Sequence, residues 1–237
     1  SQSVDFINPD LEAPTAWKAN IAFDFETPWY GIVVSAEAIR TEVQNAIFYQ
    51  QLNLGAPNQT ITGNGPASVA QDGRLIYWNN NGLNPANFNQ FGQTSGGASA
   101  RGNRTAAELK FNNAIIAHST DKGSSDSFTL ALSQPFNNND WSWNVAYTYT
   151  DATEVSPLTS STSSSQLGNV AVFQANEEVE ARSSYSIQDR FTGAVNWKHN
   201  FWGDNQTMIT VFYEGRSGRP YSYTFDNDAN GDGRFND

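Results

Sequence analysis

The stretch that decides the fold is Trp141-Ser142-Trp143-Asn144-Val145-Ala146-Tyr147-Thr148-Tyr149-Thr150. Large apolar side chains alternate here with small or polar ones along the whole stretch. Successive side chains of a β-strand point to opposite faces of a sheet. The alternation therefore predicts a strand that has one apolar face and one polar face.

The same alternation recurs along the chain, for example from Trp17 to Glu26 and from Phe191 to Lys198. It predicts six strands, at about 14–26, 31–50, 122–134, 141–154, 184–200 and 206–223. We therefore expect an all-β fold, with strands longer than the five to six residues or so that are usual in globular proteins.

The connections between these strands alternate in length. Short ones lie at about 27–31, 135–140 and 201–205, and long polar ones lie near 51–121, 155–183 and 224–237. Aromatic residues flank the short connections, as in Trp29-Tyr30 and Phe201-Trp202. Short periplasmic turns, long extracellular loops and aromatic girdles are typical of transmembrane β-barrels. The pattern thus favours a segment of a large antiparallel transmembrane β-barrel over a soluble sandwich.

The composition excludes several other classes of protein. No stretch approaches the roughly 18 consecutive apolar residues of a membrane-spanning helix. The chain has no cysteine and only two histidines, His118 and His199, which excludes thiolate zinc sites and multi-histidine metal centres. Its net charge is −11 and its 13 basic residues form no cluster, so we expect no nucleic-acid partner.

Five segments of the chain resemble the barrel of TonB-dependent outer-membrane receptors, in particular the Oar-like group. They are Asn8-Pro9-Asp10-Leu11-Glu12-Ala13-Pro14-Thr15, Asn45-Ala46-Ile47-Phe48-Tyr49-Gln50, Ser186-Ile187-Gln188-Asp189-Arg190-Phe191, Gly215-Arg216-Ser217-Gly218-Arg219-Pro220-Tyr221-Ser222-Tyr223, and the acidic segment from Asp226 to Asp237. The resemblance spans most of the chain apart from residues 51–105, and the block from Gly215 to Asp237 is its most specific part.

The resemblance implies an active importer with a barrel of about 22 strands, an N-terminal plug and a TonB box. Six strands cannot close a barrel, which needs at least about eight, so we expect residues 1–237 to form a partial barrel domain without the plug. Ligand capture and uptake across the bacterial outer membrane are then the expected function, and no enzyme is expected. The implied partners are outer-membrane lipid, an extracellular ligand of unknown class, and TonB through the absent N-terminal region.

The acidic segment also predicts one metal site. Asp226, Asp228, Asn230, Asp232 and Asp237 follow the spacing of a calcium-binding loop, with Gly231 at its sixth position. The twelfth position is Asp in place of the longer Glu, so such a site would be weak. The alternative is an ordinary turn, because Asn, Asp and Gly also favour turns.

Three further hypotheses stay open at this point. The run Glu177-Glu178-Val179-Glu180 could bind a cation or could simply be a solvated loop. Asp24, Glu26 and Glu37 could form the carboxylate pair of a hydrolase, or could face a water-filled barrel lumen. As a whole, the chain could instead be a secreted, soluble β-rich module that binds calcium or mediates adhesion.

Overall fold

The computed structural model describes residues 2–58, 73–82, 103–105, 110–136, 138–225 and 228–234. Its elements, in chain order, are β1 (Gln2–Ile7), β2 (Thr15–Glu26), β3 (Val33–Gln51), β4 (Phe111–Thr120), β5 (Gly123–Gln134), β6 (Trp141–Glu154), α1 (Ser163–Asn169), β7 (Ala181–Arg182), β8 (Asp189–Trp202) and β9 (Asn205–Arg216). All six expected strands are confirmed, as β2, β3, β5, β6, β8 and β9, with boundaries that shift by a few residues. The largest shifts are at β8, which begins at Asp189, and at β9, which ends at Arg216.

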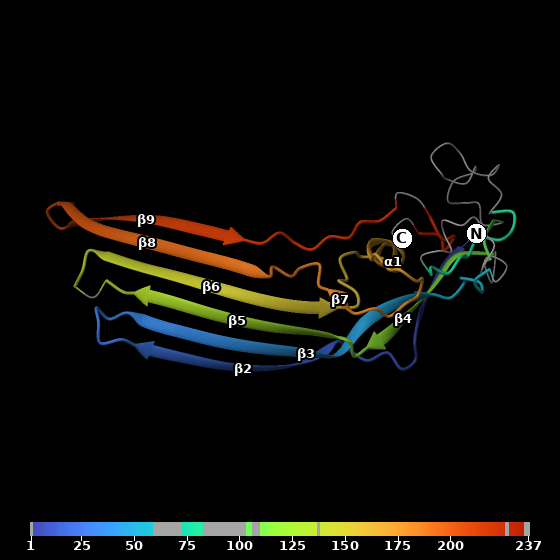
Figure 1. Ribbon diagram of the computed structural model, residues 1–237, viewed down its shortest axis with the longest axis horizontal. Helices are drawn as coiled ribbons and strands as arrows, with labels where there is room; N and C mark the ends of the chain where they lie inside the picture. The colour runs from blue at the N-terminus through green and yellow to red at the C-terminus, as the bar shows by residue number, and fades with distance from the viewer. Residues whose placement is uncertain are drawn as a thin grey trace.

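These six strands lie side by side in one antiparallel sheet, in the order β2-β3-β5-β6-β8-β9 (Figure 1). The sheet is open: within the described residues, β2 pairs only with β3 and β9 pairs only with β8. The expectation of an all-β fold is therefore confirmed. No helix in the described part of the chain is long and apolar enough to cross a membrane.

The strand register brings the apolar sides of the six strands onto the same face of the sheet. Directly paired residues of antiparallel strands share a face, and two successive rows across the sheet are Phe23, Ala36, Leu130, Tyr147 and Phe191, then Phe25, Val34, Leu132, Val145, Gly193 and Tyr213. No described part of the chain forms a second layer over these side chains. Phe23 is 61% exposed, and Val211, on the same side of β9, is 65% exposed. We call this side of the six strands the apolar face.

The opposite side, the polar face, carries mainly Ser, Thr, Asn and charged residues. One of its rows is Ala22, Glu37, Thr129, Thr148 and Arg190. Cross-strand hydrogen bonds join its side chains, for example between the hydroxyls of Thr129 and Thr148 at 3.0 Å. Several apolar residues interrupt the polar pattern, among them Val33, Ile39, Met208 and Phe212.

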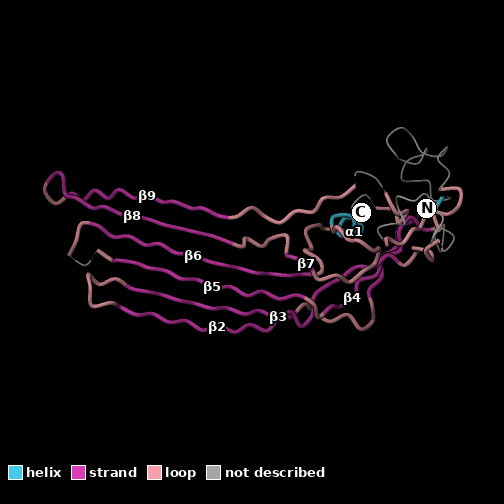
Figure 2. Tube along the Cα trace, viewed as in Figure 1, coloured by secondary structure: helices cyan, strands magenta, loops and turns pink. Residues whose placement is uncertain are grey.

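The two ends of the sheet differ as the lengths of the connections predict. The three short turns, β2–β3, β5–β6 and β8–β9, lie together at one end (Figure 2). Tyr30 and Gly31 in the first turn and Gly203 in the last adopt positive φ angles, which allow the chain to reverse tightly. The described parts of the long connections lie at the opposite end together with α1 and β7, and we call this end the loop end (Figure 1).

Three strands, β1, β4 and the two-residue β7, were not expected from the sequence. β4 occupies residues 111–120, so the connection expected near 51–121 is shorter than expected. β4 pairs antiparallel with the C-terminal part of β3 and parallel with β1, so it lies between them. Ala114 and Ile115, two consecutive residues, are both buried. Burial on both faces removes the period-two pattern from which a strand is recognised.

Candidate functional site

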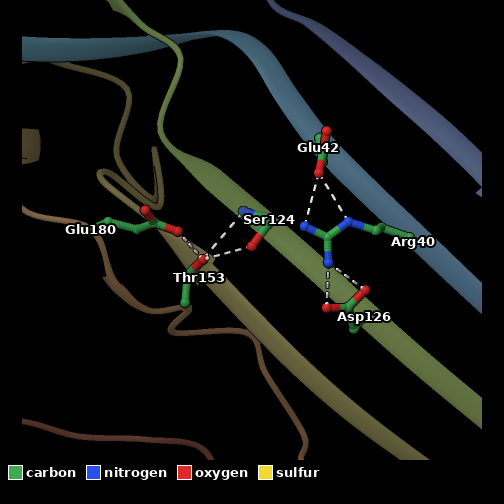
Figure 3. A network of polar contacts seen from close by, with 6 residues as sticks. All are labelled: Arg40, Glu42, Ser124, Asp126, Thr153 and Glu180. Atoms are coloured by element: carbon green, nitrogen blue, oxygen red, sulfur yellow. Dashed lines mark hydrogen bonds and ion pairs between the residues drawn. The ribbon is translucent and has the colours of Figure 1, made fainter.

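The apolar face ends at a row of charged residues near the loop end. Arg40 pairs across the sheet with Asp126, which in turn pairs with Asp151. The Arg40 guanidinium donates to the Glu42 carboxylate at 2.8 Å and to both oxygens of Asp126 at 2.8 and 3.0 Å (Figure 3). Arg40 is exposed, so these contacts fix its side chain more than they stabilise the sheet.

Hydroxyl groups continue this polar border across the next strands. Thr153 donates to the Glu180 carboxylate and lies 3.3 Å from the Ser124 hydroxyl (Figure 3). The apolar face therefore changes to a polar one between the row of Phe128 and Tyr149 and the row of Asp126 and Asp151. Sequence reasoning missed this border, although the change from apolar to charged residues between Ala38 and Arg40 is visible in the sequence of β3.

Aromatic rings line the apolar face at the end of the sheet where the three short turns lie, which we call the turn end. Trp141 and Trp197 lie opposite each other on β6 and β8, with their ring centroids 5.9 Å apart. Phe201 contacts both Trp197 and His199, and the neighbouring Trp202 is 74% exposed. His199 thus packs within an aromatic cluster, stacked on Trp197 at 5.5 Å. Trp29 and Tyr30 in the β2–β3 turn are also exposed.

The predicted calcium loop is only partly within the described residues, because Asp226 and Asp237 lie outside them. Asp228, Asn230 and Asp232 lie together and are buried, with exposed fractions of 7%, 1% and 5%. Their side-chain oxygens accept backbone hydrogen bonds. Asp228 accepts from Gly231 at 2.6 Å and from Gly233 at 2.9 Å, Asn230 accepts from the Asp232 N–H, and Asp232 accepts from the Arg234 N–H.

A second segment far away in the sequence holds this loop in place. The Arg104 guanidinium lies 3.0 Å from a carboxylate oxygen of Asp228 and 5.7 Å from the centre of the Trp78 ring. The Tyr77 N–H donates to the Asn230 carbonyl at 2.6 Å. Gly231 leaves room for Trp78, because a Cβ there would lie 2.5 Å from the Trp78 nitrogen. We call Tyr77, Trp78, Arg104, Asp228 and Asn230 the loop cluster.

The loop cluster bears on the calcium prediction without testing it. A calcium ion at Asp228 would compete with two backbone N–H groups and with Arg104. Burial raises the pKa of Asp232 and, with the neighbouring Asp232 carboxylate as the second cause, raises the pKa of Tyr77. Within the described ranges, no group of three or more His, Cys, Asp and Glu side chains is placed to hold a metal ion. The contacts seen are those of a hydrogen-bonded turn.

The other residues singled out in the sequence have separate structural partners. Glu178 accepts from Thr120 and lies 3.6 Å from the Lys122 ammonium, whereas Glu180 lies on the polar border. Asp24 accepts from Ser35 on the polar face, and Glu37 accepts from Asn20 at 3.4 Å. His118 is hydrogen-bonded to Asn8 at 2.8 Å. Each of these groups thus has a nearby structural role.

No known protein family matches the chain, and neither does any curated protein.

Proposed function

We propose that the chain is a wall segment of an outer-membrane receptor barrel of the TonB-dependent type, and that it takes part in ligand capture and uptake. The observation that carries this proposal is the apolar face. Six neighbouring strands expose their large apolar side chains to one side, in register, and no described part of the chain forms a layer over them. A face of this extent on a soluble protein would be an aggregation liability, whereas lipid covers it without cost.

The dimensions of the apolar face support the same proposal. On β6 it extends from Trp141 at the turn end to Tyr149, next to the polar border. At a rise of about 3.4 Å per residue, these eight steps span about 27 Å along the strand. A strand tilt of about 40° reduces this to about 20 Å across a membrane, close to the apolar band of about 25 Å in known barrels.

The polar face would then line the lumen, and the open edges at β2 and β9 would pair with further strands of the complete barrel. An open edge in water would be a site of aggregation. The turn end would face the periplasm and the loop end the outside of the cell. Outer-membrane lipid, an extracellular ligand and TonB are the partners under this proposal.

Single engineered cysteines in the complete protein test the proposed topology, because the natural chain contains no cysteine. In intact cells, an impermeant thiol reagent should label Asn80→Cys at the loop end and leave Asn138→Cys at the β5–β6 turn unlabelled. Disruption of the outer membrane should expose both, which controls for reactivity. Labelling of position 138 alone would invert the topology, and a protein soluble without detergent would favour the secreted module.

A further inference from the structure

The apolar face contains a hollow of about 380 Å³ next to the polar border. Most of its lining residues lie in two successive rows of the apolar face, on β2, β3, β5 and β6. Two small residues, Ala19 and Ala38, lie in these rows beside the larger Ile21, Phe128 and Tyr149. Small side chains among large ones leave a depression in the surface of a sheet, and we call this one the border hollow.

The two ends of the border hollow differ in polarity. Arg40 and Asp126 line the end that is nearer to the loops, where they form an ion pair (Figure 3). Towards the turn end, the hollow is lined by apolar and aromatic side chains such as Ala38 and Phe128. Every residue of the four strands that form the hollow is described. This arrangement suits a molecule that has a charged head and a hydrocarbon chain.

The polar border has an unpaired carboxylate beside the border hollow. Arg40 is already paired with Glu42 and with Asp126, at 2.8 Å to each. Asp151 lies directly opposite Asp126 in the strand register, so the two carboxylates share a face. No hydrogen bond or ion pair joins the Asp151 side chain to another described residue. Like charges directly opposite each other destabilise a sheet, so this pair favours a cation beside it.

The charged groups in the neighbouring rows do not reverse this balance. Arg182 pairs with Thr153 in the next row and adds one positive charge. Glu180 accepts a hydrogen bond from Thr153, and Asp189 pairs with Tyr149, so these two residues add two negative charges. Two arginines thus lie among five carboxylates, which are those of Glu42, Asp126, Asp151, Glu180 and Asp189. A headgroup that brings a cation fits this border better than one that brings only a phosphate.

Trp17 indicates the depth of the border in the proposed membrane. It pairs with Glu42 in the row next to Arg40, and it is 53% exposed. Tryptophan is enriched at the level of the lipid headgroups, where its ring is partly in water. Under the proposed function, the polar border therefore lies among the headgroups. The border hollow then lies where the acyl chains begin.

We propose that the border hollow binds one membrane lipid whose headgroup carries a primary amine, as phosphatidylethanolamine does. One acyl chain lies in the hollow over Ala38, and the ammonium group donates hydrogen bonds to Asp126 and Asp151. A primary ammonium has three N–H donors, as in lysine, whereas the quaternary ammonium of phosphatidylcholine has none. Phosphatidylglycerol brings a negative charge without a cation. The inference names a lipid partner for the proposed barrel wall and rests on that proposed function.

The test is a titration of the purified complete protein in detergent with phosphatidylethanolamine, phosphatidylcholine and phosphatidylglycerol of identical acyl chains. Native mass spectrometry resolves the first lipid that binds. We expect phosphatidylethanolamine to bind more tightly than the other two by about fivefold or more. An Asp126→Asn, Asp151→Asn double variant should reduce this preference to about twofold or less. The matched control is Asp24→Asn, Glu37→Gln, which removes two carboxylates from the polar face and should leave the preference unchanged.

A second pair of variants tests the hollow itself. Ala38→Phe fills the border hollow and should weaken the first binding event by about fivefold or more, whichever lipid is used. Val34→Phe places the same ring on the same strand and face but does not line the hollow, so it should leave the affinity unchanged. Both substitutions add only apolar atoms to the apolar face, so we expect both variants to fold.

Each other outcome overturns the proposal. Tightest binding of phosphatidylglycerol would assign the border to phosphate groups, and equal binding of phosphatidylcholine would remove the role of the N–H donors. An unchanged preference in the Asp126 and Asp151 double variant, or unchanged affinity in Ala38→Phe, with native-like circular dichroism, would exclude the border hollow as the lipid site. Lipid selectivity in detergent does not depend on the orientation of the protein in cells, and cysteine labelling does not depend on a headgroup. Failure of the lipid assignment is thus distinguishable from failure of the proposed topology.

Discussion

The sheet and the loop end of this protein differ in how much their large apolar side chains are exposed. Along β2 and β9, large apolar side chains such as Phe23 and Val211 are more than half exposed. At the loop end, Ile76, Tyr77 and Trp78 have exposed fractions of 4–5%. The loop end thus contains a small core of buried rings and paired polar groups. The described part of the sheet has no such core, and this exposure is the reason why we propose that lipid covers its apolar face.

The largest effect should come from breaking the loop cluster. Asp228→Ala removes the carboxylate that caps Gly231 and Gly233 and leaves Arg104 with an unpaired buried charge. Removal of one partner of a buried ion pair costs about 3–5 kcal/mol. We expect the amide protons of Tyr77 and Asn79 to lose at least a hundredfold protection in hydrogen exchange. Asp204→Ala, an exposed acid in the β8–β9 turn, is the control and should leave the loop end unchanged.

The next effect concerns the two faces of the sheet. Val145 shares a row with Leu132 and Gly193 on the apolar face, whereas Ala146 shares one with Ala131 and Thr192 on the polar face. If lipid covers the apolar face, Val145→Arg should destabilise the folded barrel by about 2–4 kcal/mol. Asn144→Arg and Ala146→Arg should cost much less. Folding of the complete barrel into lipid vesicles measures the difference, and equal or reversed costs would contradict the assigned faces.

The third prediction concerns the affinity of the acidic segment at the loop end for calcium. Asp228 already accepts two backbone hydrogen bonds and forms an ion pair with Arg104. We therefore expect calcium to bind the complete protein no more tightly than the weak extracellular class of loops, with dissociation constants of about 10⁻⁴–10⁻³ M. Calorimetric titration should show this weak binding or none. Tight binding that an Asp226→Ala, Asp228→Ala double variant abolishes would show instead that the segment is a dedicated metal site.

The smallest effect should come from Asp232→Asn. Burial raises the pKa of Asp232 above 3.8, so this carboxyl favours the folded loop when it is protonated and loses that contribution as the pH rises through its folded pKa. The amide oxygen of Asn can still accept from the Arg234 N–H. We expect the variant to be as stable as the natural protein at neutral pH, or more stable by up to about 1 kcal/mol. Exchange measured against pH should show this difference vanish in acid, and a large loss at neutral pH would contradict it.

The six long strands were determined by the sequence itself. Period-two alternation is continuous from Trp141 to Thr150. It also marks the other five strands, with exceptions such as Ile39, Met208 and Phe212. The short turns were equally clear, because Pro28, Gly31 and Gly203 interrupt the alternation where the chain reverses. The alternation also fixed which residues share the apolar face, since the strands pair in register.

The structure of the loop end could not be predicted from the sequence, because it depends on tertiary contacts. β4 has buried residues on both faces and pairs in parallel with β1, more than a hundred residues away in the chain, so no local pattern marks it. The ion pair between Asp228 and Arg104 and the hydrogen bond from the Trp78 ring to the Ala229 carbonyl were missed for the same reason, because both contacts are long-range. The acidic spacing alone is compatible with a metal loop or a turn. Two neighbouring hollows at the loop end likewise form between segments near residues 74, 154–184 and 220–225. Period-two alternation and turn-forming residues are local signals that extend over a few residues. Contacts between distant segments depend instead on how the whole chain packs.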